Sequence, residues 1–445
     1  MKTKIKSSLL LGILTLGTII GFLALSVGIA SATEIITVEP SGGDDTANIQ
    51  AAFNAAGPGD TVQLTAGQFY TNEIFVTDFV GTFKGAGKGA TKIDVLRGLD
   101  ESLEGVSIDY LTKSTHLFTF FGGDVHISDL IFDITPYEPA NVWGPDPPGD
   151  PPVVWYDLLS VILITGDLNS RIENIKFTGH EGTAVYDDPE HPLFSEKTYN
   201  VRVGVEYGGG PPTTGSHIIT DCEFNSLWLG ITAWGLMNCE LSIMSNSIQG
   251  GAIGIINVAN INSKFKISGN EIEANFKASI WVMKFIPSPC QWLITRNTLR
   301  PSIWADGIML EDYTGSGAFE AVVSHNKITL DDTIWGGIWT LMLQDAYISN
   351  NIIRGTGAYG IECDFSINNL LLGNNVQNVD AFWFPIILYK SSNCVIVGGS
   401  TKTSVADFAG SNNIIVGMNN MQGNSPGQEI QEAMELKREL IQSFY

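Results

Sequence analysis

The chain has 445 residues, of which 16% are charged and 10% are aromatic, and its formal net charge at pH 7 is −23. A chain this rich in aromatic side chains and this poor in charge is not disordered as a whole. The negative charge repels nucleic acid phosphates and anionic lipid headgroups, so we expect no nucleic acid partner and no adsorption to a membrane surface. We also expect no cofactor, although Ca²⁺ could bridge the acidic protein to a polyanionic glycan.

Residues 1–32 carry the pattern of a secretory signal. Three lysines within the first six residues form a basic head, residues 9–29 are apolar, and Ala30-Ser31-Ala32 resembles a cleavage site. The alternative is an uncleaved anchor, because the apolar stretch is long enough to span a bilayer. Cleavage would leave a mature chain, from residue 33 onward, that is secreted and lies outside the cell or at its surface.

A short helix is predicted at residues 47–56. Asp45 or Thr46 can cap its first turn, and Gly57-Pro58-Gly59 ends it. Its apolar residues share one face, as expected of a helix that caps the open end of a stack of strands. The alternating residues 60–70 predict the strand that follows.

Two stretches interrupt the strand pattern. Residues 135–153 are rich in Pro, and residues 179–215 combine Pro and Gly with several acidic side chains. Long irregular excursions from a regular scaffold often carry function, so these two could form one wall of a groove. The alternative is that they decorate the surface.

A six-residue phrase recurs about every 25 residues in the second half of the chain, and such a period marks a repeat architecture. It reads apolar, small polar, any, Asn, any, apolar, and weaker copies upstream put Leu130, Ile175 and Cys222 in the Asn place. The β-branched runs and Asn/Gly turns predict strands. One Asn at the same turn of every coil predicts a ladder of side-chain amides. Its members are Asn246, Asn270, Asn297, Asn326, Asn351 and Asn374.

These elements predict an all-β fold, a single-stranded right-handed parallel β-helix over residues 33–424 with an N-terminal helical cap. Residues 425–445 change character, because Ser425 and Pro426 begin a helix pattern. Residues 429–443 predict an amphipathic helix with Ile430, Met434, Leu440 and Ile441 apolar. We expect this helix to fold back over the last coil or along its side, and the alternative is an exposed helix that docks a partner.

The N-terminal helix and the Gly-rich residues 82–93 resemble the start of secreted pectate-lyase-like β-helix proteins. The Asn repeats resemble the parallel β-helix repeats of the same superfamily, so the resemblance covers most of the mature chain. It implies the fold and not one activity, because the superfamily includes lyases, glycoside hydrolases, epimerases, esterases and non-catalytic surface proteins. No specific enzyme family is matched.

A further strand follows the Asn turn of each coil and usually begins Gly-Ile. Its second and fourth residues point inward, so its third and fifth residues point outward. Stacking the outward residues gives an apolar and aromatic face with three carboxylates, and in pectate-lyase-like enzymes this face commonly carries the substrate groove. The first column is Thr232, Ile256, Trp281, Met309, Trp339, Glu362 and Ile387, and the second is Trp234, Val258, Met283, Glu311, Leu341, Asp364 and Tyr389.

Candidate catalytic residues lie on this face. Glu311 and Asp364 are two coils apart, and flexing side chains would bring them within the separation that inverting glycoside hydrolysis requires. Asp306, Asp312 and Glu362 are candidate assisting carboxylates. Because sugar rings stack on aromatic side chains, the candidate substrate-binding residues are Trp281, Trp339, Trp234 and Tyr389.

Two other enzyme classes are compared with this face. Asp306-Gly307-Ile308 resembles part of the polygalacturonase catalytic strand, but Gly336-Gly337 stand where that family has paired Asp. A lyase would need a base such as Lys or Arg. Lys284 shares a column with Asp312, so we expect a surface ion pair there. The five Cys include no Cys-x-x-Cys pair and read as small core residues, which predicts no metal site.

The sequence therefore favours a secreted protein that binds polysaccharide or another cell-envelope component. If the carboxylates lie in an open cleft, the protein is a polysaccharide hydrolase or lyase. The alternative is a non-catalytic surface or adhesion protein, whose apolar face is covered by an excursion, the C-terminal helix or another subunit. The sequence predicts neither the substrate nor the oligomeric state.

Overall fold

The computed structural model describes residues 33–96, 116–135, 141–143, 154–156, 159–182, 198–199, 201–251, 253–316, 319–377, 384–401, 405–416 and 420–423. The predicted signal at residues 1–32 and the predicted helix at residues 429–443 lie outside these ranges. Within them no helix is long and apolar enough to cross a membrane.

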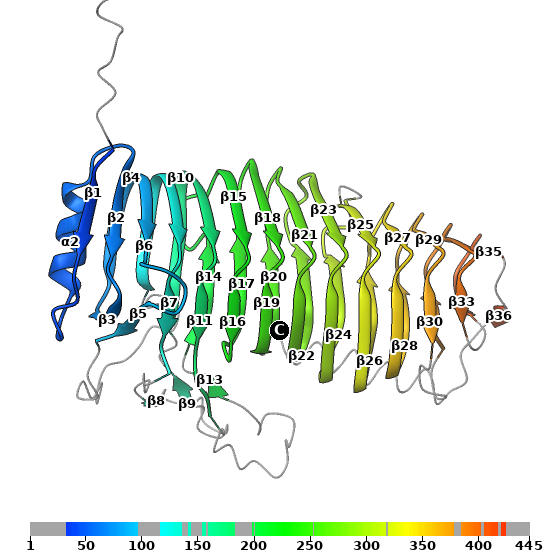
Figure 1. The fold of residues 1–445 in the computed structure, drawn as a ribbon. Coiled ribbons are helices and arrows are strands. Elements are labelled where there is room, and N and C mark those ends of the chain that lie inside the picture. Colours follow the sequence, from blue (N-terminus) through cyan, green and yellow to red (C-terminus); the bar gives the residue numbers. More distant parts are fainter. Residues whose placement is uncertain are drawn as a thin grey trace, which may run out of the picture. The chain divides into compact units, whose positions relative to one another are not determined.

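The unit that begins at Ile35 is a parallel β-helix, in which each strand pairs in parallel with its counterpart one coil away (Figure 1). We name three faces of the coil in the order in which the chain visits them. The first face contains β1 (Ile35–Val38), β2 (Asp60–Leu64), β15 (Gly215–Thr220), β18 (Cys239–Met244), β21 (Lys264–Ser268), β23 (Cys290–Thr295), β25 (Phe319–Ser324), β27 (Tyr347–Ser349), β29 (Leu370–Leu372), β32 (Val395–Val397) and β35 (Ile414–Val416).

The second face follows the Asn turn, and the third face completes the coil. The second face contains β3 (Gly67–Thr71), β5 (Thr91–Val95), β7 (Ile131–Asp133), β11 (Lys176–Thr178), β16 (Glu223–Asn225), β19 (Ser247–Gly251), β30 (Asn375–Gln377) and β33 (Ser400–Thr401). The third face contains β14 (Val201–Tyr207), β17 (Leu229–Trp234), β20 (Ile253–Val258), β31 (Ile386–Tyr389), β34 (Val405–Phe408) and β36 (Asn420–Gly423).

Seven long strands bend from one face to the next. Three run from the third face into the first face of the following coil: β4 (Ile74–Lys84), β6 (His116–Ser128) and β10 (Leu159–Glu173). Four run from the second face into the third: β22 (Glu271–Lys284), β24 (Thr298–Asp312), β26 (Lys327–Leu341) and β28 (Ile352–Asp364). The fold is the right-handed parallel β-helix that the resemblance to pectate-lyase-like proteins implied.

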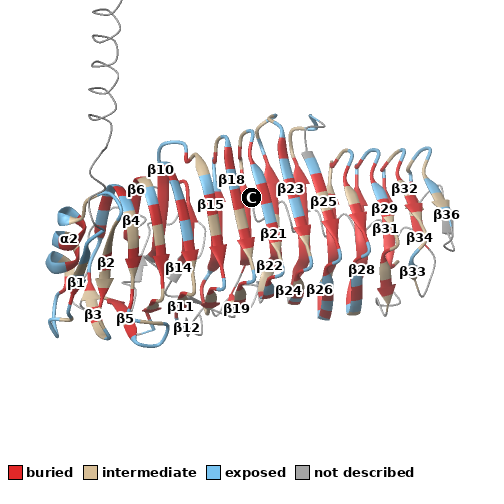
Figure 2. Ribbon diagram, turned by 45° about the horizontal axis from the view of Figure 1, so that its top comes forward, coloured by how far each residue is buried: buried red, intermediate tan, exposed pale blue. Residues whose placement is uncertain are grey.

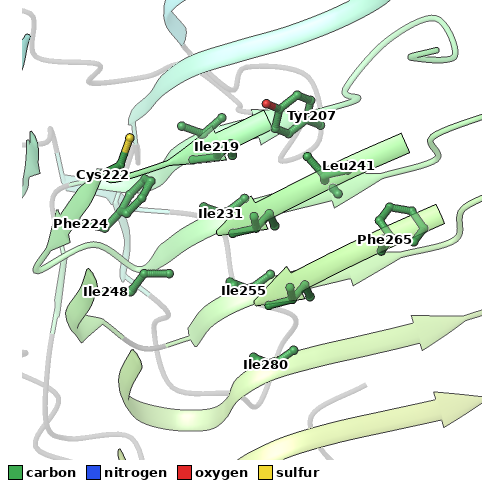
Figure 3. Close-up of a cluster of buried hydrophobic side chains, with 14 of the residues drawn as sticks. Tyr207, Ile219, Cys222, Phe224, Ile231, Leu241, Ile248, Ile255, Phe265 and Ile280 are labelled. Atoms are coloured by element: carbon green, nitrogen blue, oxygen red, sulfur yellow. The ribbon is translucent and has the colours of Figure 1, made fainter. Parts of the chain in front are cut away.

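The core lies inside the coil. Buried and exposed residues alternate along first-face strands such as β21 and β23 (Figure 2), as the two-residue period of a strand requires. The inward residues stack in columns, and Figure 3 shows Ile231, Ile255 and Ile280 in one of them. In the weak copies of the Asn phrase, the last apolar place holds Phe132, Phe177 and Phe224, whose rings stack with centroids 5.4 and 4.7 Å apart.

The Asn ladder is confirmed. From Asn246 to Asn374, each side-chain Nδ2 donates to the Oδ1 of the next ladder residue at 3.0 Å. The backbone N–H of each residue donates to the same oxygen, and Nδ2 also reaches a carbonyl of the preceding coil, as from Asn297 to Ile267. The ladder begins at the backbone N–H of Cys222, which donates to Asn246 Oδ1 at 3.0 Å. The coils from Asn246 to Asn374 are therefore each joined to the next by buried amides.

A helix, α2 (Thr46–Ala55), is present where the sequence predicts one. Its Phe53 packs on Phe79, Phe83 and Phe120 of the early coils, with ring centroids 5.1–5.8 Å away. The predicted cap is wrong in detail, because neither Asp45 nor Thr46 caps the first turn with its side chain. Asp45 instead accepts backbone hydrogen bonds from Ser41 and Tyr70.

The predicted excursion at residues 179–215 is too long. Residues 201–207 form β14, which pairs with β10 and β17 on the third face. The chain thus returns to the coil before the Gly and Pro residues that suggested a continuing loop. In the first excursion, β8 (Asn141–Trp143) pairs antiparallel with β9 (Val154–Tyr156), which directly follows the predicted end at residue 153. In the second, β12 (Glu181–Gly182) pairs antiparallel with β13 (Thr198–Tyr199).

Candidate functional site

The register of the third face matches the two predicted outward columns. Trp281 pairs with Met309, Met309 with Trp339, and Trp339 with Glu362. In the second column, Glu311 pairs with Leu341, and Leu341 with Asp364. The two Trp residues and the two candidate acid–base carboxylates are therefore each two coils apart. The structure extends the first column upstream through Leu163 and Glu206 to Thr232.

This outward face is buried in the structure. Glu311 is 0% exposed, Glu362 2% and Asp364 3%, while Met309 and Trp339 are each 2% exposed. Its apolar residues form two hydrophobic clusters separate from the interior core, one around Trp339 and Tyr359 and one around Val258 and Met283. Of the predicted sugar-binding residues, Trp234 is exposed, Trp281 is partly exposed, and Trp339 and Tyr389 are buried.

Glu311 is held by two aromatic side chains. The indole N–H of Trp281 donates to Oε2 of Glu311 at 2.7 Å, and the hydroxyl of Tyr313 donates to Oε1 at 3.0 Å. Trp281 projects from β22, Glu311 lies near the end of β24, and Tyr313 follows it in the turn. Both oxygens of a fully buried carboxylate therefore have fixed hydrogen-bond donors, which holds the group in one orientation.

Asp306 and Asp364 have similar partners. Oδ1 of Asp306 accepts the hydroxyl of Tyr359 at 2.6 Å and the backbone N–H of Gly336 at 2.8 Å. Oδ2 of Asp364 accepts the indole N–H of Trp339 at 3.3 Å. Burial and the Asp306 carboxylate raise the pKa of Tyr359 well above its usual value, so its phenol stays protonated and can only donate to Asp306.

Lys277 joins this group, although sequence reasoning missed it. Its ammonium lies 4.8 Å from the ring centroid of Trp281, and the residue is 9% exposed. Burial lowers the pKa of Lys277, whereas the carboxylates of Glu311 and Asp306 oppose that shift. The backbone φ of Lys277 is +62°, a conformation that side chains other than Gly rarely adopt. A cation in a strained backbone position thus lies close enough to two candidate carboxylates to interact with their charges.

Lys284 and Asp312 are partners on neighbouring coils as expected, but both residues are buried, so the predicted surface location is wrong. Burial lowers the pKa of Lys284, and the charge of Asp312 opposes that shift. Asp312 accepts hydrogen bonds from the backbone and hydroxyl of Thr314, and Lys284 Nζ donates to Ser316 at 3.3 Å. Asp312 therefore fixes the turn after β24. The hydrogen-bond donors to Asp312 thus differ from those to Glu311, Asp306 and Asp364, which accept hydrogen bonds from aromatic side chains.

Exposed rings line the edge of the third face where its strands end. Trp234 ends β17 and is 41% exposed, Phe285 follows β22 and is 48% exposed, and Phe365 follows β28 and is 38% exposed. Phe285 stacks on Tyr313 with ring centroids 4.9 Å apart and planes 8° from parallel. Beyond Phe365, the ammonium of Lys390 lies 5.3 Å from the Phe365 ring. We call Trp234, Phe285, Tyr313 and Phe365 the aromatic edge.

Among the residues that the structure describes, no group of three or more His, Cys, Asp or Glu side chains could hold a metal ion. On the third face, Glu311, Asp306 and Asp364 accept hydrogen bonds from aromatic side chains, whereas Glu206 bonds His116 and Ser160. The residues that reasoning from the sequence missed, Lys277, Tyr313, Tyr359 and Glu206, lie at the corners of the coil or upstream of the Asn phrase. No repeated phrase marks those positions.

No protein-family model matches the chain, and no curated protein matches it. Solved structures do. The mannuronan C-5 epimerase AlgE4 A-module of Azotobacter vinelandii matches with a TM-score of 0.43 and 14% identity, over 86% of this chain and 94% of that chain. PfbA, a surface adhesin of Streptococcus pneumoniae, matches with a TM-score of 0.48 and 13% identity, over 88% of this chain and 93% of that chain. The DFA-IIIase of Arthrobacter chlorophenolicus matches with a TM-score of 0.47 and 14% identity, over 85% and 93%. These similarities assign no activity to this chain.

Proposed function

We propose that this protein acts outside the cell and binds polysaccharide along the aromatic edge of the third face. The observation that carries the proposal is the set of exposed or partly exposed rings at the ends of four third-face strands, β17, β22, β24 and β28. Rings at the same corner of neighbouring coils recur at multiples of about 4.8 Å. An extended sugar chain parallel to the coil axis could then stack on several of them, each stack contributing about 1 kcal/mol.

The proposed acid–base residues are Glu311 and Asp364, with Asp306, Asp312 and Glu362 assisting. The support is their hydrogen bonding, because Trp281, Tyr313, Tyr359 and Trp339 fix carboxylate oxygens on one face. Lys277 is the corresponding base for lyase chemistry, since burial favours its neutral amine. Trp281, Trp339 and Tyr389 would contact sugar on the same face, next to Trp234 at its edge.

A second candidate function is a non-catalytic surface or adhesion protein. It is favoured by the burial of Glu311, Glu362 and Asp364, because a reacting carboxylate must reach its substrate. In that case the aromatic edge alone contacts the polysaccharide, and the carboxylates stabilise the packing of the third face.

The binding test uses affinity electrophoresis of the purified protein in gels that contain neutral or acidic polysaccharides, with and without Ca²⁺. We expect Phe285→Ala and Trp234→Ala each to weaken binding about fivefold, the loss of one stacking contact. Leu293→Ala is the matched control, because Leu293 is equally exposed but lies on the first face. Equal binding by all three variants would contradict the aromatic edge as the binding surface.

The same panel separates enzyme from adhesion protein. New reducing ends without ultraviolet absorbance indicate a hydrolase, and Glu311→Gln should then abolish them. Absorbance from unsaturated uronates indicates a lyase, and Lys277→Gln should then abolish it. Binding without any product on a broad panel supports the non-catalytic function.

A further inference from the structure

A group of basic side chains interrupts the acidic surface on the second face. The chain carries 24 Lys and Arg against 47 Asp and Glu, yet four of the cations lie on three successive coils. Arg296 lies at the turn before β24, and Arg300 lies within β24. Lys327 begins β26 and Arg354 lies near the start of β28, on the next two coils of the stack (Figure 1). We call Arg296, Arg300, Lys327 and Arg354 the basic patch.

The register places these cations close together and outside the coil. Lys327 pairs with Thr298 across β24 and β26, and Arg354 pairs with Thr329 across β26 and β28. Ile328, between Lys327 and Thr329, is buried inside the coil, whereas all four cations are exposed. Because neighbouring strands are about 4.8 Å apart, the patch extends about 10 Å along the coil.

Most of this positive charge is uncompensated. Arg300 pairs with Glu271 of the preceding coil at 2.9 Å. Arg296, Lys327 and Arg354 form no ion pair with any residue that the structure describes. Three further exposed acids lie at the borders of the patch: Glu273, Asp331 and Asp332. An anion that is narrow enough to pass between these acids therefore meets three unpaired cations.

Polar groups that suit a sugar lie among the cations. Thr298 and Thr329 lie in the strands and Asn350 at the Asn turn, each of them partly or fully exposed. Hydroxyl and amide groups can donate hydrogen bonds to sugar hydroxyls and accept hydrogen bonds from them. The guanidinium groups of Arg296 and Arg354 match a carboxylate, which a guanidinium binds through two parallel hydrogen bonds. The surface thus offers partners for both the hydroxyls and the carboxylate of a uronate ring.

The size and composition of the patch favour a polysaccharide over other anionic partners. Proteins that bind single-stranded nucleic acid stack the bases on aromatic rings, and residues 296–300, 325–329 and 350–354 include no Phe, Tyr or Trp. A nucleic acid duplex or a membrane would bring dense negative charge against the rest of a chain whose net charge is −23. A single extended glycan strand is narrow enough to contact the cations and leave the border acids in water.

We propose that the basic patch is a second glycan-binding surface, which holds one strand of a carboxylate-bearing polysaccharide directly, without a bridging Ca²⁺. Arg296, Lys327 and Arg354 bind the carboxylates, and Thr298 and Thr329 bind ring hydroxyls. The surface lies on the second face and shares no residue with the aromatic edge, so this proposal does not rest on the proposed function. It assigns the recognition of acidic polysaccharide to a face of the coil that carries none of the candidate catalytic residues.

The test is the fluorescence anisotropy of a labelled oligogalacturonate titrated with the purified protein in EDTA, at about 50 mM and about 200 mM salt. We expect binding in EDTA that weakens as the salt concentration rises, because exposed charges carry it. Lys327→Gln/Arg354→Gln should weaken binding about tenfold at the lower salt concentration, the loss of two exposed charge contacts.

The matched control is Lys264→Gln/Lys266→Gln, which removes two exposed cations from β21 on the first face. It changes the net charge by the same amount and should weaken binding by less than about twofold. Thermal unfolding of both double variants should match that of the unmodified chain, because all four side chains are exposed. Trp234→Ala should leave the affinity for the oligogalacturonate unchanged, which separates this surface from the aromatic edge.

Four results would overturn the proposal. The unmodified chain could fail to bind the oligogalacturonate in EDTA, or the two double variants could lose affinity equally, which would show a general charge effect. A single-stranded DNA oligonucleotide or phosphatidylglycerol vesicles could bind the patch more tightly than the glycan does. Finally, self-association measured by sedimentation could disappear in Lys327→Gln/Arg354→Gln, which would show that the acidic surface of a second copy occupies the patch. None of these results bears on the aromatic edge, because its binding of a neutral polysaccharide depends on Trp234 and Phe285.

Discussion

Two regions of this molecule bury polar side chains, and they do so in opposite ways. Inside the coil, the ladder from Asn246 to Asn374 uses the same amide and the same 3.0 Å bond in every coil. On the outside of the third face, each carboxylate has a different partner, such as Trp281 and Tyr313 for Glu311 or Tyr359 for Asp306.

The amides of the ladder are repeated and interchangeable, whereas each carboxylate of the third face has its own specific partners. An Asn repeated at the same turn of every coil forms its hydrogen bonds with its own copies in the neighbouring coils. The ladder therefore stabilises the coil without marking any one position along it. Carboxylates with individual donors define particular places, such as the coils from β22 to β28 for Glu311 and Asp364 and β14 for Glu206. Buried polar groups that are individually arranged are candidates for function, whereas the repeated ones are part of the scaffold.

Breaking the ladder in its middle should have the largest effect on stability. Asn297→Leu removes the acceptor of both the backbone N–H and the side-chain amide of Asn270, and deprives Asn326 Oδ1 of the side-chain donor while the backbone N–H of residue 297 remains. We expect the apparent free energy of unfolding to fall by about 4 kcal/mol. At the start of the ladder, Asn246→Leu leaves only the backbone N–H of Cys222 unsatisfied, so we expect about 2 kcal/mol. Chemical denaturation measures the loss of unfolding free energy in both variants. Equal losses would show that the amides do not act as one hydrogen-bonded ladder.

Acidification should lower the free energy of unfolding through His217, a buried polar residue that is not part of a repeated ladder. His217 bonds Ser170 Oγ through Nδ1 at 2.9 Å and the Thr214 carbonyl through Nε2 at 3.0 Å, and burial lowers its pKa to about 4. The unfolded chain binds its proton near pH 6.5, so stability is complete above that pH and is lost as the pH falls toward 4. The loss is about 3 kcal/mol, and His217→Gln should flatten this part of the pH profile. An unchanged slope in that variant would assign the titration to another group.

Removing one donor from the third face should have a smaller effect. Tyr359→Phe keeps the ring but removes the hydroxyl that donates to Asp306 Oδ1, while the backbone N–H of Gly336 still donates to that oxygen. We expect a loss of about 1.5 kcal/mol in the free energy of unfolding, because one charge-assisted hydrogen bond disappears. Tyr70→Phe on the second face is the control for removal of a hydroxyl. If the two variants lose the same stability, the phenol of Tyr359 is not a specific partner of Asp306.

Changes at the turn before each ladder Asn should have the smallest effect. The residue there has a positive φ in every coil of the ladder, which is +69° at Gly269 and +58° at His325. Gly269→Ala should lower stability by about 1 kcal/mol through backbone strain alone, since its new Cβ would meet nothing closer than 3.8 Å. His325→Gly should raise stability by about 0.5 kcal/mol. Thermal unfolding measures the change in stability of both variants. Changes in the same direction would contradict the strain argument.

The scaffold could be predicted because its signals repeat. The Asn phrase and the two-residue period of the strands fixed the ladder and the register of the third face from Thr232 to Tyr389. The burial of that face could not be predicted from the same strands. The strand pattern places Met309 and Trp339 outward whether solvent or another layer of protein covers them. Lys277 and Tyr359 were missed because they precede the Gly-Ile phrase, at a corner whose residues do not repeat. Residues 201–207 were missed as a strand because the Gly and Pro residues after them read as a continuing loop.

The cysteines can serve as natural probes of the order in which the coils unfold. All five are buried free thiols, and burial raises the pKa of each, so none presents the thiolate that reacts with alkylating reagents. They are spread along the stack, from Cys222 near the start of the ladder to Cys394 near its last coils. Pulse alkylation during unfolding would therefore date the exposure of successive coils without any introduced label, and show from which end the stack comes apart.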